Sequence, residues 1–328
     1  MTATLPLLET VVVGGVALLF LVKSAETTVD RVLRLAQHYD VPDALVGMTV
    51  VAIGTSLPEI GSHVIASVGI LSGTLDYTIA SATTLGGNMG SSTTQQTLLA
   101  GLFLVGFGGF ELTRQFLRSV YVPMVLAFVL TLGVAWDGTV TRLDGLVLLL
   151  GYVVYAGYSL HTRPRGVALP AAASEDVSRD ALVAVLGLVG VLVGAFLILG
   201  EVQSVVERFG LSGSMVGVVT LGLASALPEL STVVDAIRRR APNLALGTLF
   251  GSNVVNPLIG IGLGGTISTY AVPESVVLWD LPFKIAVGVG LLAYLRLVSN
   301  GRLTRREGGY MVILYFVYVS GRYLFFAG

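Results

Sequence analysis

The chain has no cysteine, and only 12% of its 328 residues are charged. The missing cysteine excludes disulfides, thiolate metal ligands and cysteine nucleophiles, and it leaves the redox compartment undetermined. Soluble domains carry about 25% charged residues, so a soluble protein is excluded as well. The formal net charge is −1, which argues against nucleic acid as a partner because such binding needs clustered Lys and Arg.

Long apolar runs take the place of the missing charge, and hydrophobic residues make up 54% of the chain. A bilayer core of ~30 Å requires about 20 apolar residues per helix. The N-terminus lacks the positive region of a cleaved signal peptide, so its first apolar run is expected to be a retained span. The predicted spans are 6–30, 42–71, 77–107, 119–136, 143–161, 181–206, 212–237, 243–270, 278–297 and 308–326. The sequence therefore predicts an all-α integral membrane protein with about ten transmembrane helices.

A polar stretch divides these spans into five and five. We expect a first repeat in residues 1–162, a linker in 163–180 and a second repeat in 181–328. Because five is odd, two such repeats in series cross the membrane in opposite senses, which is typical of transporters with a midplane site. Most of the Lys and Arg fall on one side if the N-terminus is outside, so we expect both termini outside and a cytoplasmic linker in a cell-membrane protein.

Two stretches of similar sequence contain the candidate cation-binding residues. Val46 to Ile60 reads VGMTVVAIGTSLPEI and Val216 to Leu230 reads VGVVTLGLASALPEL. Each contains one carboxylate in an apolar run, and such residues mark ion or proton paths. The preceding proline breaks the helix and frees a backbone carbonyl, which can coordinate a cation together with nearby hydroxyls. A kinked helix with a neutralised carboxylate would explain one copy but not two. The candidate ligands are Glu59, Glu229, the carbonyls of Gly54 and Ala224, and the hydroxyls of Thr55, Ser56 and Ser225.

A second pair of polar segments follows these motifs. Gly86 to Thr97 reads GGNMGSSTTQQT, and Gly247 to Pro257 reads GTLFGSNVVNP. Small residues allow close helix packing, and side-chain amides can offer a neutral oxygen to a cation. We favour cation binding for Gln95 and Asn256, which align between the two segments. Helix packing with interhelical hydrogen bonds accounts fully for Asn88 and Asn253.

GTSLPE followed by a GS-x-x-x-N segment, repeated in two five-span halves, resembles the alpha repeats of the cation/calcium antiporter superfamily, especially the sodium/calcium exchangers. The resemblance covers most of the chain. It implies ten transmembrane helices, two of them broken at the midplane, and alternating access through sliding of the first and sixth spans. It implies antiport of a divalent cation, Ca²⁺ first, for Na⁺, with no cofactor. The cation-binding residues that it implies are Thr55, Ser56, Glu59, Ser91, Gln95, Ser225, Glu229, Ser252 and Asn256.

Departures from that pattern leave the coupling ion open. The second motif reads ASALPE, with Ala226 where the exchangers have serine, and Asn256 stands where their segment often ends in Asp. Gln95 replaces the usual Asn, and GSSTTQ is similar to the proton/calcium branch. Sodium is the first choice and protons the alternative, while Ca²⁺, Mg²⁺ and Mn²⁺ are not separated because selectivity depends on cavity size and ligand rigidity.

His63 lies four residues after Glu59, on the same helix face. It could accept a coupling proton, bind a transition metal, or form hydrogen bonds between helices.

Two other protein classes also place carboxylates in the membrane. A channel fits duplicated, proline-broken helices less well than an antiporter does, and an intramembrane hydrolase would need substrate-handling groups that the sequence does not show. No enzymatic activity is therefore expected. The partners indicated are inorganic cations and the lipid bilayer, and no protein partner can be inferred.

Overall fold

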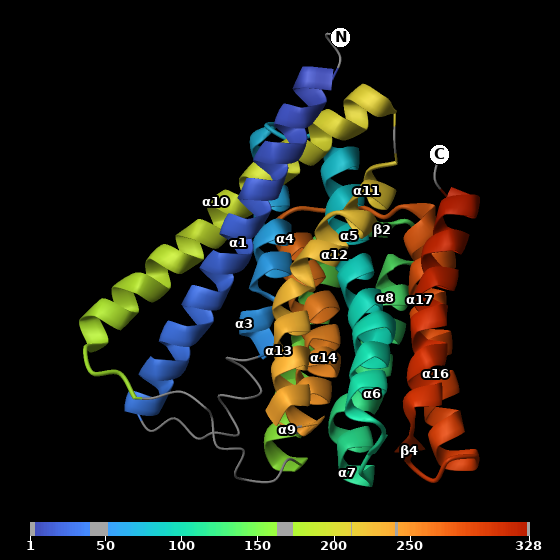
Figure 1. The fold of residues 1–328 in the computed structure, drawn as a ribbon. Coiled ribbons are helices and arrows are strands. Elements are labelled where there is room, and N and C mark those ends of the chain that lie inside the picture. The colour runs from blue at the N-terminus through green and yellow to red at the C-terminus, as the bar shows by residue number, and fades with distance from the viewer. Residues whose placement is uncertain (1–3, 40–51, 163–172, 211, 240–241, 327–328) are drawn as a thin grey trace.

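The computed structural model describes all residues except 1–3, 40–51, 163–172, 211, 240–241 and 327–328. The described chain is almost entirely helical, and seven of its helical segments have the length and hydropathy of a membrane span. The helices run roughly side by side, and both termini lie at the same end of the bundle (Figure 1). The predicted all-α membrane fold is confirmed. The beginning of the first motif, residues 46–51, lies outside the described residues.

Residues up to 162 form the first set of elements. These are α1 (Thr4–His38), α3 (Ala52–Thr55), α4 (Leu57–Ser72), α5 (Tyr77–Thr93), the π-helical turn η2 (Thr94–Leu99), α6 (Ala100–Phe107), β1 (Phe110–Glu111), α7 (Arg114–Phe116), the π-helical turn η3 (Leu117–Tyr121), α8 (Val122–Ala135), β2 (Thr139–Val140) and α9 (Arg142–Thr162).

The remaining elements follow in a similar order. They are α10 (Val177–Phe209), α11 (Gly213–Val219), α12 (Leu221–Ser225), α13 (Leu227–Arg239), α14 (Pro242–Val255), the π-helical turn η4 (Asn256–Ile261), α15 (Gly262–Ile267), β3 (Tyr270–Ala271), the π-helical turn η5 (Val276–Asp280), α16 (Leu281–Leu297), β4 (Arg302–Leu303) and α17 (Arg305–Phe326).

One short strand pair lies at each end of the bundle. β1 pairs with β4, with Phe110 opposite Leu303, and β2 pairs with β3, with Val140 opposite Tyr270. Each strand before residue 162 therefore pairs with one after residue 181. β1 and β3 each follow a helix that comes after a π-helical turn, α6 and α15 respectively, yet their two sheets lie at opposite ends of the bundle. This is the pairing that two halves of opposite orientation would give.

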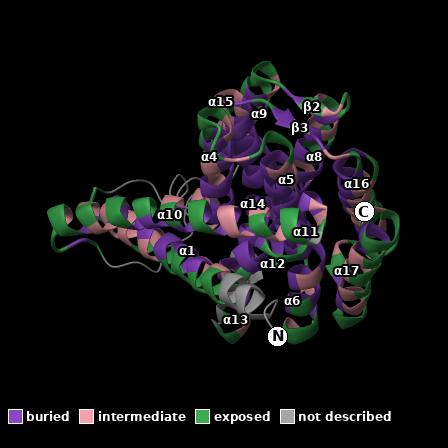
Figure 2. Cartoon of the chain, turned by 90° about the horizontal axis from the view of Figure 1, so that it is seen from above, coloured by how far each residue is buried: buried purple, intermediate pink, exposed green. Residues whose placement is uncertain are grey.

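Helices α1 and α10 form a tilted pair that extends to one side of the bundle (Figures 1 and 2). Gly190 and Gly194 of α10 pack against Ser24 and Leu21 of α1, where a Cβ atom would collide. α1 continues beyond the expected end at residue 30, because Arg31 forms an ion pair with Asp180 of α10 at 2.8 Å. α10 begins at Val177, within the stretch expected as linker.

The most buried helices occupy the middle of the bundle. Seen from above, buried residues concentrate on α4, α5 and α14 (Figure 2). α5 and α11 approach closely because Gly217 faces the backbone of Thr83 and Gly87 with no side chain between them. Many of the residues buried here are polar, which is unusual for a helix core and requires a chemical explanation.

Candidate cation-binding site

Both motif helices are broken directly before their carboxylate. α3 ends at Thr55 and α4 begins at Leu57, with Ser56 between them. In the second motif Ala226 separates α12 from α13. The prolines lie in the first turn of the new helix, where the missing N–H costs nothing. The break places Glu59 and Glu229 in the first turns of α4 and α13.

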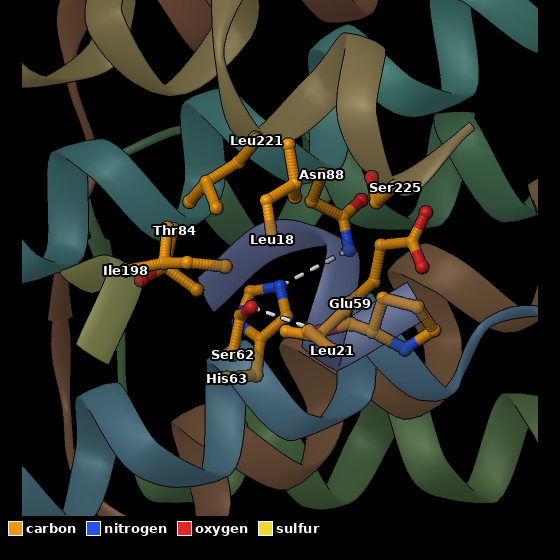
Figure 3. A pocket seen from close by; sticks show the side chains of 12 residues that line it. Leu18, Leu21, Glu59, Ser62, His63, Thr84, Asn88, Ile198, Leu221 and Ser225 are labelled. Carbon is orange, nitrogen blue, oxygen red and sulfur yellow. Dashed lines mark hydrogen bonds between the residues drawn. The ribbon is translucent and has the colours of Figure 1, made fainter. Parts of the chain in front are cut away.

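Glu59 is held by residues from both halves of the chain. Its side chain is 4% exposed. Oε1 accepts a hydrogen bond from Oγ of Ser91 at 2.5 Å and one from Nδ2 of Asn256 at 3.4 Å. Its carboxylate is directed toward Ser225 of α12 (Figure 3). Oε2 has no hydrogen-bond partner in the described part of the chain.

Glu229 is more completely enclosed, with 0% exposure, and among the described residues neither of its oxygens has a hydrogen-bond partner. The hydroxyls of Thr55 and Ser252 lie beside it and are 3.0 Å from each other. Each carboxylate is thus flanked by one hydroxyl from a motif and one from the segment that follows a motif. Each flanking pair takes one residue from either half of the chain.

Buried oxygens without a donor gather around the two carboxylates. A buried acceptor without a partner carries a desolvation cost of about 1–3 kcal/mol, so a cluster of them favours a bound ion or water. Carboxylate, hydroxyl and amide oxygens are the ligands of Ca²⁺, Mg²⁺ and Na⁺. Among the unpartnered atoms of the described chain are Oγ of Ser56 and Ser225, Oε2 of Glu59, both oxygens of Glu229, and Oδ1 of Asn253 and Asn256.

The two π-helical turns present the amides. η2 includes Gln95 and η4 begins at Asn256, so a widened turn follows the Gly-Ser pair in both segments. π-helical turns often mark functional sites. Gln95 donates to Oγ of Ser91 at 3.2 Å and accepts at Oε1 from Nδ2 of Asn253 at 2.9 Å. Gln95 is therefore linked to Glu59 through Ser91, whereas Asn256 donates to the carboxylate itself.

Asn253 was interpreted from sequence as a packing residue with interhelical hydrogen bonds, and it does donate to Gln95 across helices; its Oδ1 is in addition one of the unpartnered oxygens. The signal available in the sequence was its place beside Ser252 in the GSN triplet. The two backbone carbonyls that the sequence suggested as ligands, those of Ala224 and Gly54, have different surroundings. The carbonyl of Ala224 accepts a hydrogen bond from the amide of Ala226, and Gly54 packs against Val29 of α1.

A small cavity of about 10 Å³ is lined by Glu59 and His63, and it has space for about one water molecule. Leu18 and Leu21 of α1 and Ile198 of α10 cover it with apolar side chains (Figure 3). The helix pair that extends from the bundle therefore also closes the polar interior.

His63 is part of a hydrogen-bond network. Nδ2 of Asn88 donates to the carbonyl of Asn256 at 2.8 Å and lies 3.0 Å from Nε2 of His63. Because the amide nitrogen is a donor, Nε2 must accept, and the ring is the neutral tautomer with its proton on Nδ1. Nδ1 lies 3.3 Å from the hydroxyl of Tyr270. The structure thus places His63 in the hydrogen-bonding role, with both ring nitrogens engaged.

Within the described ranges no three His, Asp or Glu side chains converge on one point. The site consists of two carboxylates supplemented by neutral oxygens, which suits a hard cation as transported substrate better than a tightly held transition metal.

The model of the sodium/calcium exchanger protein family matches residues 10–161 and 180–324. The chain belongs to this family, and it is a membrane transporter with an antiporter fold. It is 26% identical over 326 residues to the putative antiporter CaxA of Alkalimonas amylolytica, covering 95% of this chain and 97% of that protein. It is 23% identical over 341 residues to the sodium/calcium exchanger MaX1 of Methanosarcina acetivorans, covering 92% and 94%.

The fold is similar to that of a solved exchanger. The structure of the sodium-calcium exchanger NCX_Mj soaked with Na⁺ and Sr²⁺ aligns with a TM-score of 0.64 and 21% identity, covering 95% of this chain and 98% of that one.

Proposed function

We propose that this protein exchanges a divalent cation, Ca²⁺ in the first place, for Na⁺ by alternating access. The observation that carries the proposal is the group of unpartnered oxygens around Glu59 and Glu229. Two carboxylates balance the charge of one divalent cation, and the neutral oxygens supply the remainder of six or more ligands. The family membership supports cation antiport as the setting of this site.

The proposed ligands are the groups that meet at the two carboxylates. Thr55, Ser91, Ser225 and Ser252 flank them, and Asn256 donates to one of them. Ser56 and Asn253 add unpartnered oxygens, while Gln95 positions Ser91. We further propose residues 1–162 and 181–328 as inverted repeats, with both termini outside and the linker in the cytoplasm.

Exchange requires that the site open to each side in turn. Leu18, Leu21 and Ile198 close the cavity, and all three belong to the α1 and α10 pair. Sliding of this pair along the bundle would uncover the site, and the close glycine contacts between α1 and α10 would keep the two helices together during such a movement.

Protons are the second candidate for the coupling ion. The two carboxylates can bind two protons as readily as two Na⁺, and the amides of Gln95 and Asn256 add no charge that would hold a further sodium ion.

The test is Ca²⁺ uptake into proteoliposomes with a sodium gradient and a pH gradient imposed separately. Uptake driven by sodium alone supports the proposal, and uptake driven only by the pH gradient replaces sodium with protons. Absence of uptake in both arms, with protein that is folded and correctly inserted, would overturn divalent antiport.

A further inference from the structure

A second group of buried ionisable side chains lies in the protein interior, apart from the cation site. Asp280 of η5, Lys284 of α16 and Arg322 of α17 are each 0% exposed. Nε of Arg322 lies 3.0 Å from Oδ1 of Asp280, and the hydroxyl of Tyr318 donates to the same oxygen at 2.9 Å. Arg322 also donates to the hydroxyl of Ser214 in α11. One carboxylate thus shares the interior with two basic side chains.

Lys284 is the charge without a close counterion. Its Nζ lies 4.0 Å from the ring centroid of Phe128 and 3.9 Å from Sδ of Met89. Over the described residues, no ion pair within 4.0 Å brings a carboxylate to it, although the charge of Asp280 acts on it. With Asp280 paired to Arg322, a protonated Lys284 gives this cluster one positive charge in excess. A buried net charge is costly, so the ammonium form is retained only where charge of opposite sign in the same interior offsets it.

That opposite charge lies across one helix. Met89 and Gln96, on α5 and η2, contact Lys284, and Nε2 of Gln96 donates to its carbonyl at 3.1 Å. Another face of the same segment presents Ser91, which donates to Glu59. A helix with its side chains is about 10–12 Å across. The ammonium group and the site carboxylates are therefore on the order of 10 Å apart, through protein rather than water.

The repeat does not require this charge. A proline begins both α8 and α16, at positions 123 and 282. Aligning the two prolines sets Tyr121 of the first half against Asp280. It sets Val125 against Lys284. The first half is neutral where the second half is charged, so the charges are specific to this side of the site.

We propose that Lys284 is a fixed counter-cation of the ion site and determines how many cations the site accepts. The two carboxylates carry two negative charges, and the cluster of Asp280, Lys284 and Arg322 carries one positive charge. One divalent or two monovalent cations then leave the interior with one positive charge, and a third monovalent cation would raise it to two. Lys284 thereby opposes binding of a third Na⁺. The inference rests on the proposed function only in taking Glu59 and Glu229 as the ligands.

The test uses variants that change the charge of the cluster in opposite directions. Lys284→Met removes the positive charge with similar volume, and Asp280→Asn adds one. At ~10 Å and an effective dielectric constant of ~20, a unit charge changes monovalent binding roughly tenfold and divalent binding about a hundredfold. Lys284→Met should tighten Na⁺ and Ca²⁺ binding by these factors, and Asp280→Asn should weaken both. Lys284→Arg, which keeps the charge, should bind like wild type.

Calorimetric titration of the purified full-length protein with Ca²⁺ and with Na⁺ gives the readout. A packing effect would weaken binding in both variants. The fold-change in Ca²⁺ affinity would then not be the square of the fold-change in Na⁺ affinity. Unaltered affinities in Lys284→Met, or weaker binding in Lys284→Arg, would overturn the role of Lys284 alone. A wild-type protein that binds neither cation, or a Glu229→Gln variant that binds both normally, would instead overturn the proposed function.

Discussion

Nδ2 of Asn256 lies 3.4 Å from Oε1 of Glu59, so an amide and an acid that are 197 residues apart in the sequence meet in the protein interior. The amide contributes a dipole to this carboxylate and no charge. The site therefore contains two acids, and two acids balance one divalent cation or two monovalent ones.

Asn256→Asp would add a third acid at this position. We expect the variant to exchange three monovalent charges for one divalent cation, because the third carboxylate compensates the extra ion. Wild-type exchange should be nearly independent of voltage, whereas the variant should respond by ~2.3 kcal/mol per 100 mV for the one net charge moved. Ca²⁺ flux in proteoliposomes at clamped potentials measures both. A variant with the voltage dependence of wild type would place Asn256 outside the site.

Glu229→Gln should abolish divalent transport and at the same time stabilise the ion-free protein. The carboxylate is fully buried, with the hydroxyls of Thr55 and Ser252 beside it, so replacing its charge by an amide removes a desolvation penalty of about 1–3 kcal/mol. We expect a higher melting temperature without Ca²⁺ and loss of the further rise that Ca²⁺ gives to wild type. Glu274→Gln, at an exposed position, is the control and should leave both melting curves unchanged. Near-normal transport in Glu229→Gln would contradict the assignment.

Gly217→Ala tests the contact between α5 and α11. A Cβ at this position would meet the backbone of Thr83 and Gly87, and backbone atoms cannot rotate away. The two helices would have to separate, with a loss of about 1–3 kcal/mol in the free energy of unfolding. Gly247→Ala is the matched control, because no atom lies within 4 Å of its added methyl group and alanine favours the helix by about 0.5–1 kcal/mol. Thermal unfolding in detergent should shift down for the first variant and up for the second; equal shifts would disprove close packing.

His63→Gln should retain the pH dependence of transport. The Gln side chain can still accept from Asn88, and the wild-type ring is neutral because that amide already donates to it. Transport rates measured over a range of pH should give parallel profiles for variant and wild type, with at most a few-fold loss of rate. A profile that loses one titration step would show that His63 carries a transported proton.

The sequence was sufficient to locate the acids, because a lone carboxylate after a proline in an apolar run has few structural explanations. It was also sufficient for the class of fold, since ten long apolar runs are typical of a helical membrane protein. It could not show that Gln95 positions Ser91 while Asn253 keeps an unpartnered oxygen. Both are amides on the same kind of segment, and their difference arises from contacts between segments about 160 residues apart.

The cluster of Asp280, Lys284 and Arg322 could not be predicted from the sequence for a similar reason. Lys284 and Asp280 lie near the end of a predicted span, where charged residues commonly face the membrane surface. Only the packing of α16 against α8, and of α17 against α6 and η2, shows that these side chains point inward.

The crossed strand pairs have a consequence for assembly. Neither 1–162 nor 181–328 can pair its own strands, because β1 needs β4 and β3 needs β2. The carboxylates divide in the same way, since Glu59 receives its amide from the other half. Each half is therefore an incomplete folding unit, and the protein is in physical terms a heterodimer whose subunits happen to share one chain. Two separate polypeptides cut before Val177, so that α10 stays whole, should therefore need each other to complete their strand pairs.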